Sequence, residues 1–166
     1  LSELENTLTA SGQMLAFEPP HFSPDATIGG TLAAGLSGPR RPYAGSVRDF
    51  VLGVSVLNGM GECLSFGGQV MKNVAGYDLS RLMVGAMGTL GVLLEVSLKV
   101  LPLPAEERTL SFEMDGPSAV SRMNELAATP LPMSAAGYVG HQLSIRISGT
   151  ELGVKAAGRK LGGEEV

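Results

Sequence analysis

The chain has 166 residues, which is enough for one domain and a smaller second unit. It is 44% hydrophobic and 17% charged, with a net charge of −4, and this balance indicates a globular protein and disfavours a nucleic-acid-binding surface. Its one cysteine, Cys63, cannot form an internal disulfide, which fits a reducing compartment such as the cytoplasm. We expect Cys63 to be a packing residue within a strand. No apolar run reaches the ~18 residues that would span a bilayer.

The first part of the chain predicts short helices, proline-rich connections and a hairpin. In order, the expected elements are a helix over residues 2–11, an extended segment over 13–25, a glycine turn and short helix over 26–36, a loop over 37–46, a strand over 48–57 and a returning strand over 62–66. Ser2 and Glu5 have the spacing of a capping box. Pro39 and Pro42 exclude regular structure from the loop, and Asn58–Gly61 is a strong hairpin signal.

A helix and a strand follow. Asp78 is a natural N-cap for a helix through Val84, and Gly85 stands at its end. The segment Val92–Leu101 alternates apolar and polar residues, and this pattern predicts a half-buried strand. The residues expected on its apolar face are Val92, Leu94, Val96, Leu98 and Val100. Pro102 and Pro104 then end the strand, so we place the domain boundary after residue 104.

Residues 105–166 predict a second unit of a different kind. Their element order, β-α-β-β-α, is that of a ferredoxin-like unit without its last strand. The predicted fold class is therefore α+β: an antiparallel sheet flanked by helices in residues 1–104, and a partial ferredoxin-like unit in 105–166. Because the chain opens directly on helix signals at Leu1 and stops before this unit is finished, we expect a fragment of a longer protein.

The glycine turn before the second helix is the first candidate binding site. Gly29 and Gly30 carry no Cβ atoms, so the backbone there can approach a ligand closely, and Thr27 can cap the turn. Arg40 and Arg41 follow in a Gly/Pro loop and can reach a pyrophosphate bidentately. The alternatives are a tight connection that binds nothing and a solvated arginine loop.

A second block lies downstream. Gly85, Gly88 and Gly91 are spaced three apart before a strand, which lets the chain wrap closely around a planar group. The alternative is a helix C-cap followed by two turns. Lys72 and Tyr77 are candidates for polar contacts with a ligand near this block. The alternative is that each is an ordinary surface or core-edge residue.

Metal and acid–base chemistry receive little support. The two histidines, His21 and His141, lie far apart, and no HxxH, HExxH or CxxC pattern occurs. His21 is the one candidate base near the glycine turn, and a plain loop histidine is the alternative reading.

Taken together, the two blocks resemble the FAD-binding domain of the vanillyl-alcohol-oxidase/PCMH superfamily. The segments that carry the resemblance are Thr27–Gly30, Gly45–Glu62 and Lys72–Gly91, and it covers about residues 13–104. The sequence segments EPPHFSPDATIGG and SGPRRPYAGSVRDFVLG are similar to those of the FAD-binding subunits of bacterial glycolate oxidases. Met87 departs from the pattern, since usual members have a polar residue there.

The resemblance implies FAD as cofactor, lying between two subdomains of which this chain holds the second. The FAD-binding residues that it implies are Thr27, Gly29, Gly30, Thr31, Ala33, Ser37, Gly91 and Val92. The segment from Thr27 to Ala33 is expected along the pyrophosphate and flavin, and Gly91 and Val92 at the adenine. No catalytic residue and no metal ligand of the family is matched.

The function implied is a subunit that supports oxidation of glycolate to glyoxylate by electron transfer, without oxidising the substrate itself. Its expected partners are a larger flavin subunit and an iron–sulfur subunit, with peripheral association to the inner membrane through them. The isolated chain is then expected to have no turnover. Two alternatives stay open: a catalytic FAD-dependent D-2-hydroxy-acid dehydrogenase, and a structural or interaction domain without cofactor.

Overall fold

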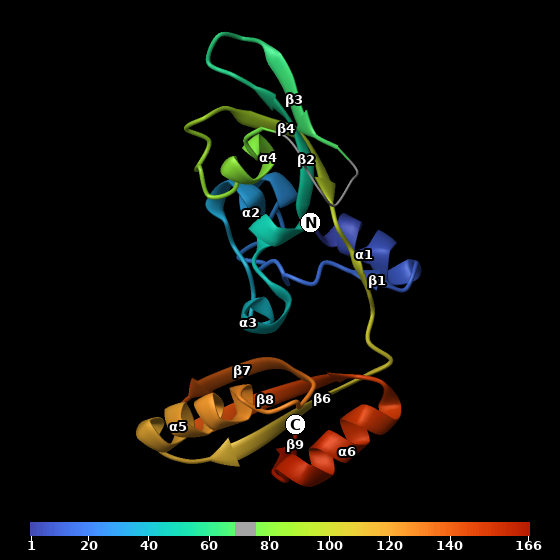
Figure 1. Ribbon diagram of the computed structural model, residues 1–166, viewed down its shortest axis with the longest axis vertical. Coiled ribbons are helices and arrows are strands. Elements are labelled where there is room, and N and C mark those ends of the chain that lie inside the picture. Colours follow the sequence, from blue (N-terminus) through green and yellow to red (C-terminus); the bar gives the residue numbers. More distant parts are fainter. Residues whose placement is uncertain (69–75) are drawn as a thin grey trace. The chain divides into compact units, whose positions relative to one another are not determined.

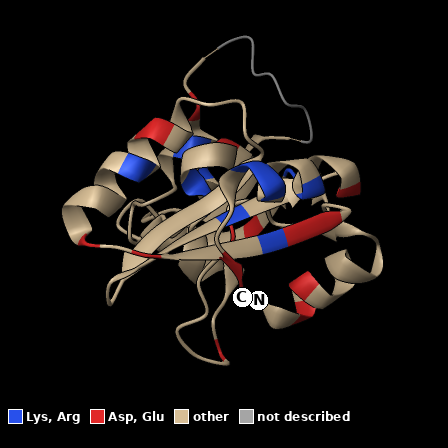
Figure 2. Ribbon diagram, turned by 90° about the horizontal axis from the view of Figure 1, so that it is seen from below, with Lys and Arg blue, Asp and Glu red and all other residues tan. Residues whose placement is uncertain are grey.

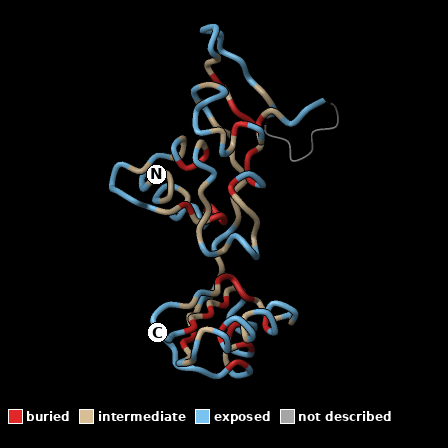
Figure 3. The backbone as a smooth tube through the Cα atoms, turned by 90° about the vertical axis from the view of Figure 1, so that its left-hand side faces the viewer, coloured by how far each residue is buried: buried red, intermediate tan, exposed pale blue. Residues whose placement is uncertain are grey.

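The computed structural model describes residues 1–68 and 76–166 and divides the chain into two compact units, Leu1–Pro102 and Leu103–Val166 (Figure 1). The division falls beside the boundary expected after residue 104. Each unit has its own cluster of buried apolar residues. Figure 3 shows these buried positions within each unit, with exposed residues at the loops and turns between elements.

The first unit is built on an antiparallel sheet with strand order β3-β2-β4, beside a short β1–β5 pair. Its elements are α1 (Ser2–Ala10), β1 (Gln13–Met14), α2 (Ile28–Ala34), α3 (Arg41–Ala44), the 3-10 helix η1 (Val47–Phe50), β2 (Val51–Leu57), β3 (Cys63–Gly67), α4 (Leu79–Leu82), β4 (Val92–Leu98) and β5 (Leu101–Pro102). The helices α2 and α4 pack against this sheet. The antiparallel sheet flanked by helices is the predicted fold class.

The core of the first unit joins the sheet to the chain that leads into α2. Phe17, Leu32 and Val47 are fully buried. The rings of Phe17 and Phe50 lie with their centroids 5.7 Å apart in a tilted arrangement, which aromatic pairs favour. Burial of these side chains fixes the segment before α2 against the start of β2, so the position of α2 is set by the core.

Local expectations fail at three places in this unit. The N-cap of α1 is Leu1 and no side chain caps the helix, so the Ser2–Glu5 capping box does not form. Residues 41–44 of the expected loop form α3, because Pro42 lies in its first turn, where no backbone N–H is needed. The expected strand over 48–57 begins only at Val51, because residues 47–50 form η1.

The side chains of the 92–101 strand that face the core also differ from those expected. The pairing of β4 with β2 shifts register between Ser55 and Val56, which leaves Leu94 as the extra residue of a β-bulge. Leu93 and Val96 consequently pack on the core, whereas Val92 and Leu94 are 59% and 51% exposed. A bulge reverses which alternate side chains face inward, so the simple alternation placed Val92 and Leu94 on the wrong face.

The β2–β3 hairpin has the predicted turn. Asn58 donates its N–H to the carbonyl of Glu62, and its side-chain Oδ1 accepts from the N–H groups of Met60 and Glu62. Such an Asx arrangement is the reason that asparagine favours turns. Cys63 begins β3 and is exposed, so it is not the packing residue that we expected.

The second unit has a four-stranded antiparallel sheet of order β7-β8-β6-β9. Its elements are β6 (Glu106–Glu113), α5 (Gly116–Ala127), β7 (Met133–Val139), β8 (Gln142–Gly149), α6 (Glu151–Leu161) and β9 (Glu164–Glu165). Both helices supply core residues that pack with Leu143, Ile145 and Ile147 of β8. This is the ferredoxin-like order, and it corrects one expectation: a last strand is present as the two-residue pairing of β9 with β6.

Charged residues of both signs are interspersed along the chain (Figure 2). Arg108 illustrates this, since it pairs with Glu106 at 2.9 Å and with Glu165 at 3.0 Å, next to the β6–β9 pairing. Among the helices of residues 1–68 and 76–166, none combines the length and the hydrophobicity needed to cross a membrane.

A strand glycine provides a test of the sheet. A Cβ atom added at Gly53 would lie 2.8 Å from the backbone N of Gly68 and 2.9 Å from its O, and backbone atoms cannot turn aside. We expect Gly53→Ala to destabilise the first unit by roughly 1–3 kcal/mol, the usual cost of overpacking. Urea unfolding measures this. Gly137→Ala in β7 is the matched control, because an added Cβ there meets nothing within 4 Å; equal stability of the two variants would contradict the packing.

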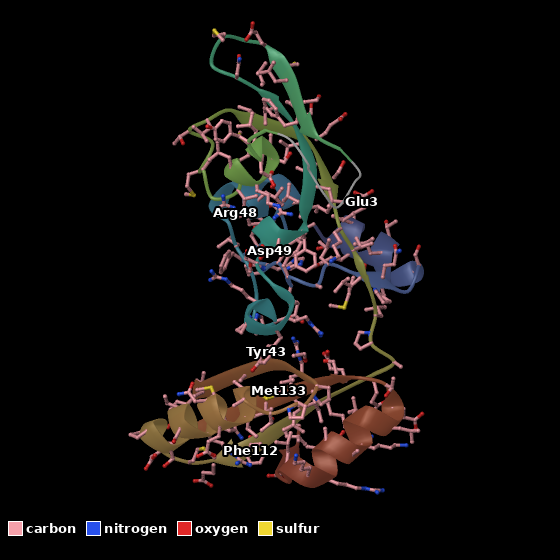
Figure 4. All side chains as sticks on the ribbon, viewed as in Figure 1. Glu3, Tyr43, Arg48, Asp49, Phe112 and Met133 are labelled. Atoms are coloured by element: carbon pink, nitrogen blue, oxygen red, sulfur yellow. The ribbon has the colours of Figure 1, made fainter. Side chains whose placement is uncertain are left out.

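The capping box of η1 provides a second test. Asp49, labelled in Figure 4, accepts hydrogen bonds from the side chain and the backbone N–H of Ser46, and these bonds hold its pKa below the usual value. A lowered pKa means that the carboxylate stabilises the fold above its unfolded pKa, ~3.9, and that this stabilisation is lost as pH falls through the folded pKa. We expect Asp49→Asn to lower the free energy of unfolding by up to about 1 kcal/mol at pH 7, because the amide keeps an acceptor but loses the negative charge in the first turn of η1.

The difference in stability between wild type and Asp49→Asn should shrink as pH falls below about 4. Thermal unfolding at several pH values measures this difference. The exposed Asp25 supplies the control substitution Asp25→Asn. A stability gap that stays constant down to the lowest pH would show that the carboxylate charge at Asp49 has no part in it.

Candidate functional site

The first side of the site is the turn into α2. Thr27 has an extended conformation, and its Oγ1 accepts the N–H of Gly30 at 3.0 Å. Its carbonyl accepts from both the N–H and the hydroxyl of Thr31. Threonine is a favoured N-cap for this reason, so the position where α2 begins follows directly from the sequence.

The far end of α2 is joined to the second glycine block by backbone hydrogen bonds. The carbonyl of Leu32 accepts the N–H of Gly85 at 3.0 Å, and the carbonyl of Ala33 accepts the N–H of Met87 at 2.8 Å. Gly35 ends the helix at φ +68°, and a Cβ atom there would lie 3.3 Å from the Cα of Gly85. The two blocks therefore form one structure, and the close approach requires glycine at position 35.

The loop between α4 and β4 is held in an unusual backbone conformation. Gly85 and Gly88 have positive φ angles, and so does Met87, at +53°. Positive φ is uncommon for a residue with a side chain and carries a strain cost, which the bond from Met87 to Ala33 helps to offset. At Gly91 a Cβ atom would lie 2.7 Å from the carbonyl of Leu57, so this glycine lets the loop pass over the β2 end.

A cavity of about 330 Å³ lies between the two blocks. This volume is at the lower end of the range for small-molecule sites, roughly 300–1,000 Å³. The residues that line it are Thr27, Gly29, Gly30, Ala33, Met83, Ala86, Gly88, Gly91, Val92 and Leu93.

Six of the eight residues that the sequence suggested line this cavity, and two do not. The hydroxyl of Thr31 is turned to the carbonyl of Thr27, and the residue is 3% exposed. The hydroxyl of Ser37 accepts the N–H of Val47 at 2.9 Å and so supports the start of η1. The other six residues lie together at the cavity, as a shared binding site requires. Their contact with FAD stays a prediction.

The other suggested polar residues lie outside the cavity lining. Arg40 is bound to Glu18 through its Nε at 3.1 Å and its backbone N at 3.0 Å. Tyr77 is 92% exposed, and Lys72 lies outside the described residues. The Nε2 atom of His21 lies 2.7 Å from a carboxylate oxygen of Glu5, so this histidine joins the segment before α2 to α1, and it is not among the residues that line the cavity.

Four lining residues were not among the eight that the family resemblance implied: Met83, Ala86, Gly88 and Leu93. Gly88 belongs to the triple-glycine pattern, so its signal was present in the sequence. Met83 is 6% exposed and follows α4, and Leu93 turns inward because of the bulge at Leu94. Nothing in local sequence marks a bulge at that residue, which explains why Leu93 was missed.

Two of the lining glycines have open space beside them. A Cβ atom added at Gly29 or at Gly88 would meet no protein atom within 4 Å. Among residues 1–68 and 76–166, no cluster of three or more His, Cys, Asp or Glu is arranged to hold a metal ion.

Comparison with known proteins assigns this geometry to a family. Residues 1–67 match the family described as FAD binding domain. Over its whole length the chain is 55% identical to glycolate oxidase subunit GlcE of Escherichia coli, of which it spans 47%. The match to the family covers 67 of the 166 residues, so it relates the first part of the chain to that family. The family match includes the Thr27 turn and α2, and the similarity to GlcE extends over the second glycine block as well.

Other proteins are similar to the chain at lower sequence identity. Glycolate oxidase subunit GlcD of Bacillus subtilis is 42% identical over 51% of the chain and 18% of that protein. The D-lactate dehydrogenase of Archaeoglobus fulgidus is 31% identical over 81% of the chain and 30% of that protein. A solved structure of alkyldihydroxyacetonephosphate synthase superposes with a TM-score of 0.75 and 20% identity, over 96% of this chain and 35% of that one, which establishes likeness of fold.

Gly29 offers a direct test of the cavity. Gly29 lines the cavity, and an added methyl group there would meet no protein atom within 4 Å, while alanine favours the helix over glycine by up to about 1 kcal/mol. We expect Gly29→Ala to keep or raise the melting temperature and to weaken FAD binding severalfold, measured by quenching of flavin fluorescence. Gly158→Ala in α6 is the control, since its Cβ would make an ordinary contact at 3.9 Å with Ile147. Unchanged FAD affinity in Gly29→Ala would contradict a close approach of the ligand to Gly29.

Proposed function

We propose that the chain forms part of the FAD-binding subunit of a glycolate oxidase and that its cavity holds part of FAD. The observation that carries the proposal is the 55% identity to GlcE over the whole chain, both sides of the cavity included. The FAD-contacting residues in this proposal are Thr27, Gly29, Gly30, Ala33, Gly91 and Val92, with Thr31 and Ser37 as supports behind them.

These residues bind and orient, and they are unsuited to proton transfer. The Oγ1 of Thr27 accepts a hydrogen bond from the N–H of Gly30. The other lining residues are glycines, residues with aliphatic side chains and one methionine. Bound FAD supplies the capacity to accept electrons from a reduced donor and to pass them on. We therefore propose that glycolate is oxidised to glyoxylate on a larger flavin subunit, and that this subunit, with an iron–sulfur partner at the inner membrane, takes part in electron transfer.

A second candidate is a D-2-hydroxy-acid dehydrogenase in its own right. It is favoured by the 31% identity to a D-lactate dehydrogenase over 81% of the chain. This activity requires a base within reach of the flavin. The sequence offered His21 as the candidate base, and in the structure His21 contacts Glu5. That position makes the electron-transfer role the better supported of the two.

Titration of the purified chain with FAD, followed by flavin fluorescence, tests binding. We expect weak but saturable binding in the micromolar range or above, because a cavity of about 330 Å³ encloses only part of a dinucleotide. Absence of saturable quenching would contradict the assignment of the cavity to FAD.

Dye reduction with glycolate or D-lactate as donor separates the two candidates. We expect none by the FAD-loaded chain alone, and glycolate-dependent reduction when the larger flavin subunit and the iron–sulfur subunit are added. Reduction by the chain alone would establish the dehydrogenase and overturn the electron-transfer role.

A further inference from the structure

Residues 21–26 lead into the turn at Thr27 and begin with His21. Residues 21–25 are exposed, so contacts with neighbouring elements, rather than burial, set the position of this segment. The N–H of Ala26 bonds to the carbonyl of Ser23 at 3.2 Å, which closes a turn immediately before Thr27. The segment is therefore a short exposed connection whose end is the start of α2.

Helix α1 contacts this segment at two points. The Nε2 atom of His21 lies 2.7 Å from Oε2 of Glu5, and the carbonyl of Ala26 accepts a hydrogen bond from the backbone nitrogen of Leu1 at 2.9 Å. The helix itself is fixed by apolar residues that pack on the core of the first unit: Leu1, Leu4 and Leu8. Through α1, the core therefore holds both the beginning and the end of residues 21–26.

The position of Ala26 determines the position of Thr27, the N-cap of α2. The Oγ1 of Thr27 accepts the N–H of Gly30 at 3.0 Å, and its carbonyl accepts the N–H of Thr31 at 3.0 Å. Thr27, Gly29 and Gly30 line the cavity. A movement of residues 21–26 away from α1 would therefore move one side of the cavity.

The contact between His21 and Glu5 depends on pH. A carboxylate only accepts hydrogen bonds, so the imidazole donates from Nε2. Histidine is the side chain whose charge ordinarily changes between about pH 5 and 8, a range in which carboxylates are ionised. At the low end of this range an imidazolium and a carboxylate form a charge-assisted pair, and at the high end a weaker neutral hydrogen bond is left. The contact is therefore strongest at low pH and weakens as pH rises.

Other charged groups lie on the two segments that meet here. They are Glu3 and the backbone nitrogen of Leu1 on the side of α1, and Glu18 and Asp25 on the side of His21. Glu18 pairs with Arg40 at 3.1 Å, and the nitrogen of Leu1 donates to Ala26. Glu3 and Asp25 are exposed, so each can serve as a control for the general effect of removing a negative charge.

We propose that His21 is a positioning residue for the cavity: its contact with Glu5 holds residues 21–26 against α1 and is strengthened when the imidazole is protonated. This inference rests on the proposed function and adds that FAD binding to this chain depends on pH. FAD binds more tightly at about pH 5.5 than at about pH 8, by up to about fivefold, the equilibrium equivalent of one exposed ion pair.

Flavin fluorescence titrations of the 166-residue chain at several pH values measure this dependence. His21→Gln and Glu5→Gln each remove the ion pair, and Glu3→Gln and Asp25→Asn are the matched controls. We expect both pair variants to bind FAD at about pH 5.5 as weakly as wild type does at about pH 8, with an affinity that changes less than about 1.5-fold over the range. The two controls are expected to keep the pH dependence of wild type.

Hydrogen exchange of the Gly30 and Thr31 amides without FAD reports on the turn itself. Both amides are bonded to Thr27, so opening of the turn exposes them to exchange. After correction for the intrinsic pH dependence of exchange, we expect their protection in wild type to fall by up to about fivefold between about pH 5.5 and 8. In His21→Gln the protection should stay the same across this range.

Two results would overturn this inference and leave the proposed function intact: an FAD affinity of wild type that does not change with pH, or a pH dependence that His21→Gln retains. Absence of FAD binding at every pH would overturn the proposed function. The exchange measurement then still decides whether His21 holds the turn, and equal protection of Gly30 and Thr31 at both ends of the pH range would contradict that role.

Discussion

The site depends on two backbone hydrogen bonds that join segments far apart in the sequence: the carbonyl of Leu32 to the N–H of Gly85, and the carbonyl of Ala33 to the N–H of Met87. The carbonyls at the end of a helix need partners from outside its regular hydrogen bonds. Here the second glycine block supplies a donor to Ala33 and a second donor, beside the N–H of Gly35, to Leu32. Without this connection, α2 and the loop before β4 would be separate surface features with no cavity between them.

Much of this arrangement could be predicted from local sequence, because local chemistry determines it. The cap at Thr27, the turn at Asn58 and the need for glycine at positions 85, 88 and 91 each follow from side-chain or backbone preferences within a few residues. The class of fold followed from the apolar alternation and the helix signals. The resemblance to FAD-binding domains then related the two blocks to one cofactor.

What the sequence did not reveal depends on contacts between distant elements. The bulge at Leu94 arises from the pairing of β4 with β2, and it determines that Leu93 faces the cavity and Leu94 the solvent. The hydrogen bonds of Ser37 with Val47 and of His21 with Glu5 are likewise tertiary contacts. In each case the residue type allowed either a ligand-binding or a structural role, and the packing of neighbouring elements decided between them.

The close contact between Gly35 and Gly85 has a consequence for how this protein can change over evolutionary time. A Cβ atom at position 35 would lie 3.3 Å from the Cα of Gly85, so a side chain there must push the second block away, and the positive φ of Gly35 adds backbone strain. At Gly85 an added Cβ atom meets no atom within 4 Å, and the positive φ alone disfavours a side chain. We therefore expect a substitution at position 35 to be tolerated only together with a shift of the second block, whereas a substitution at position 85 costs backbone strain alone.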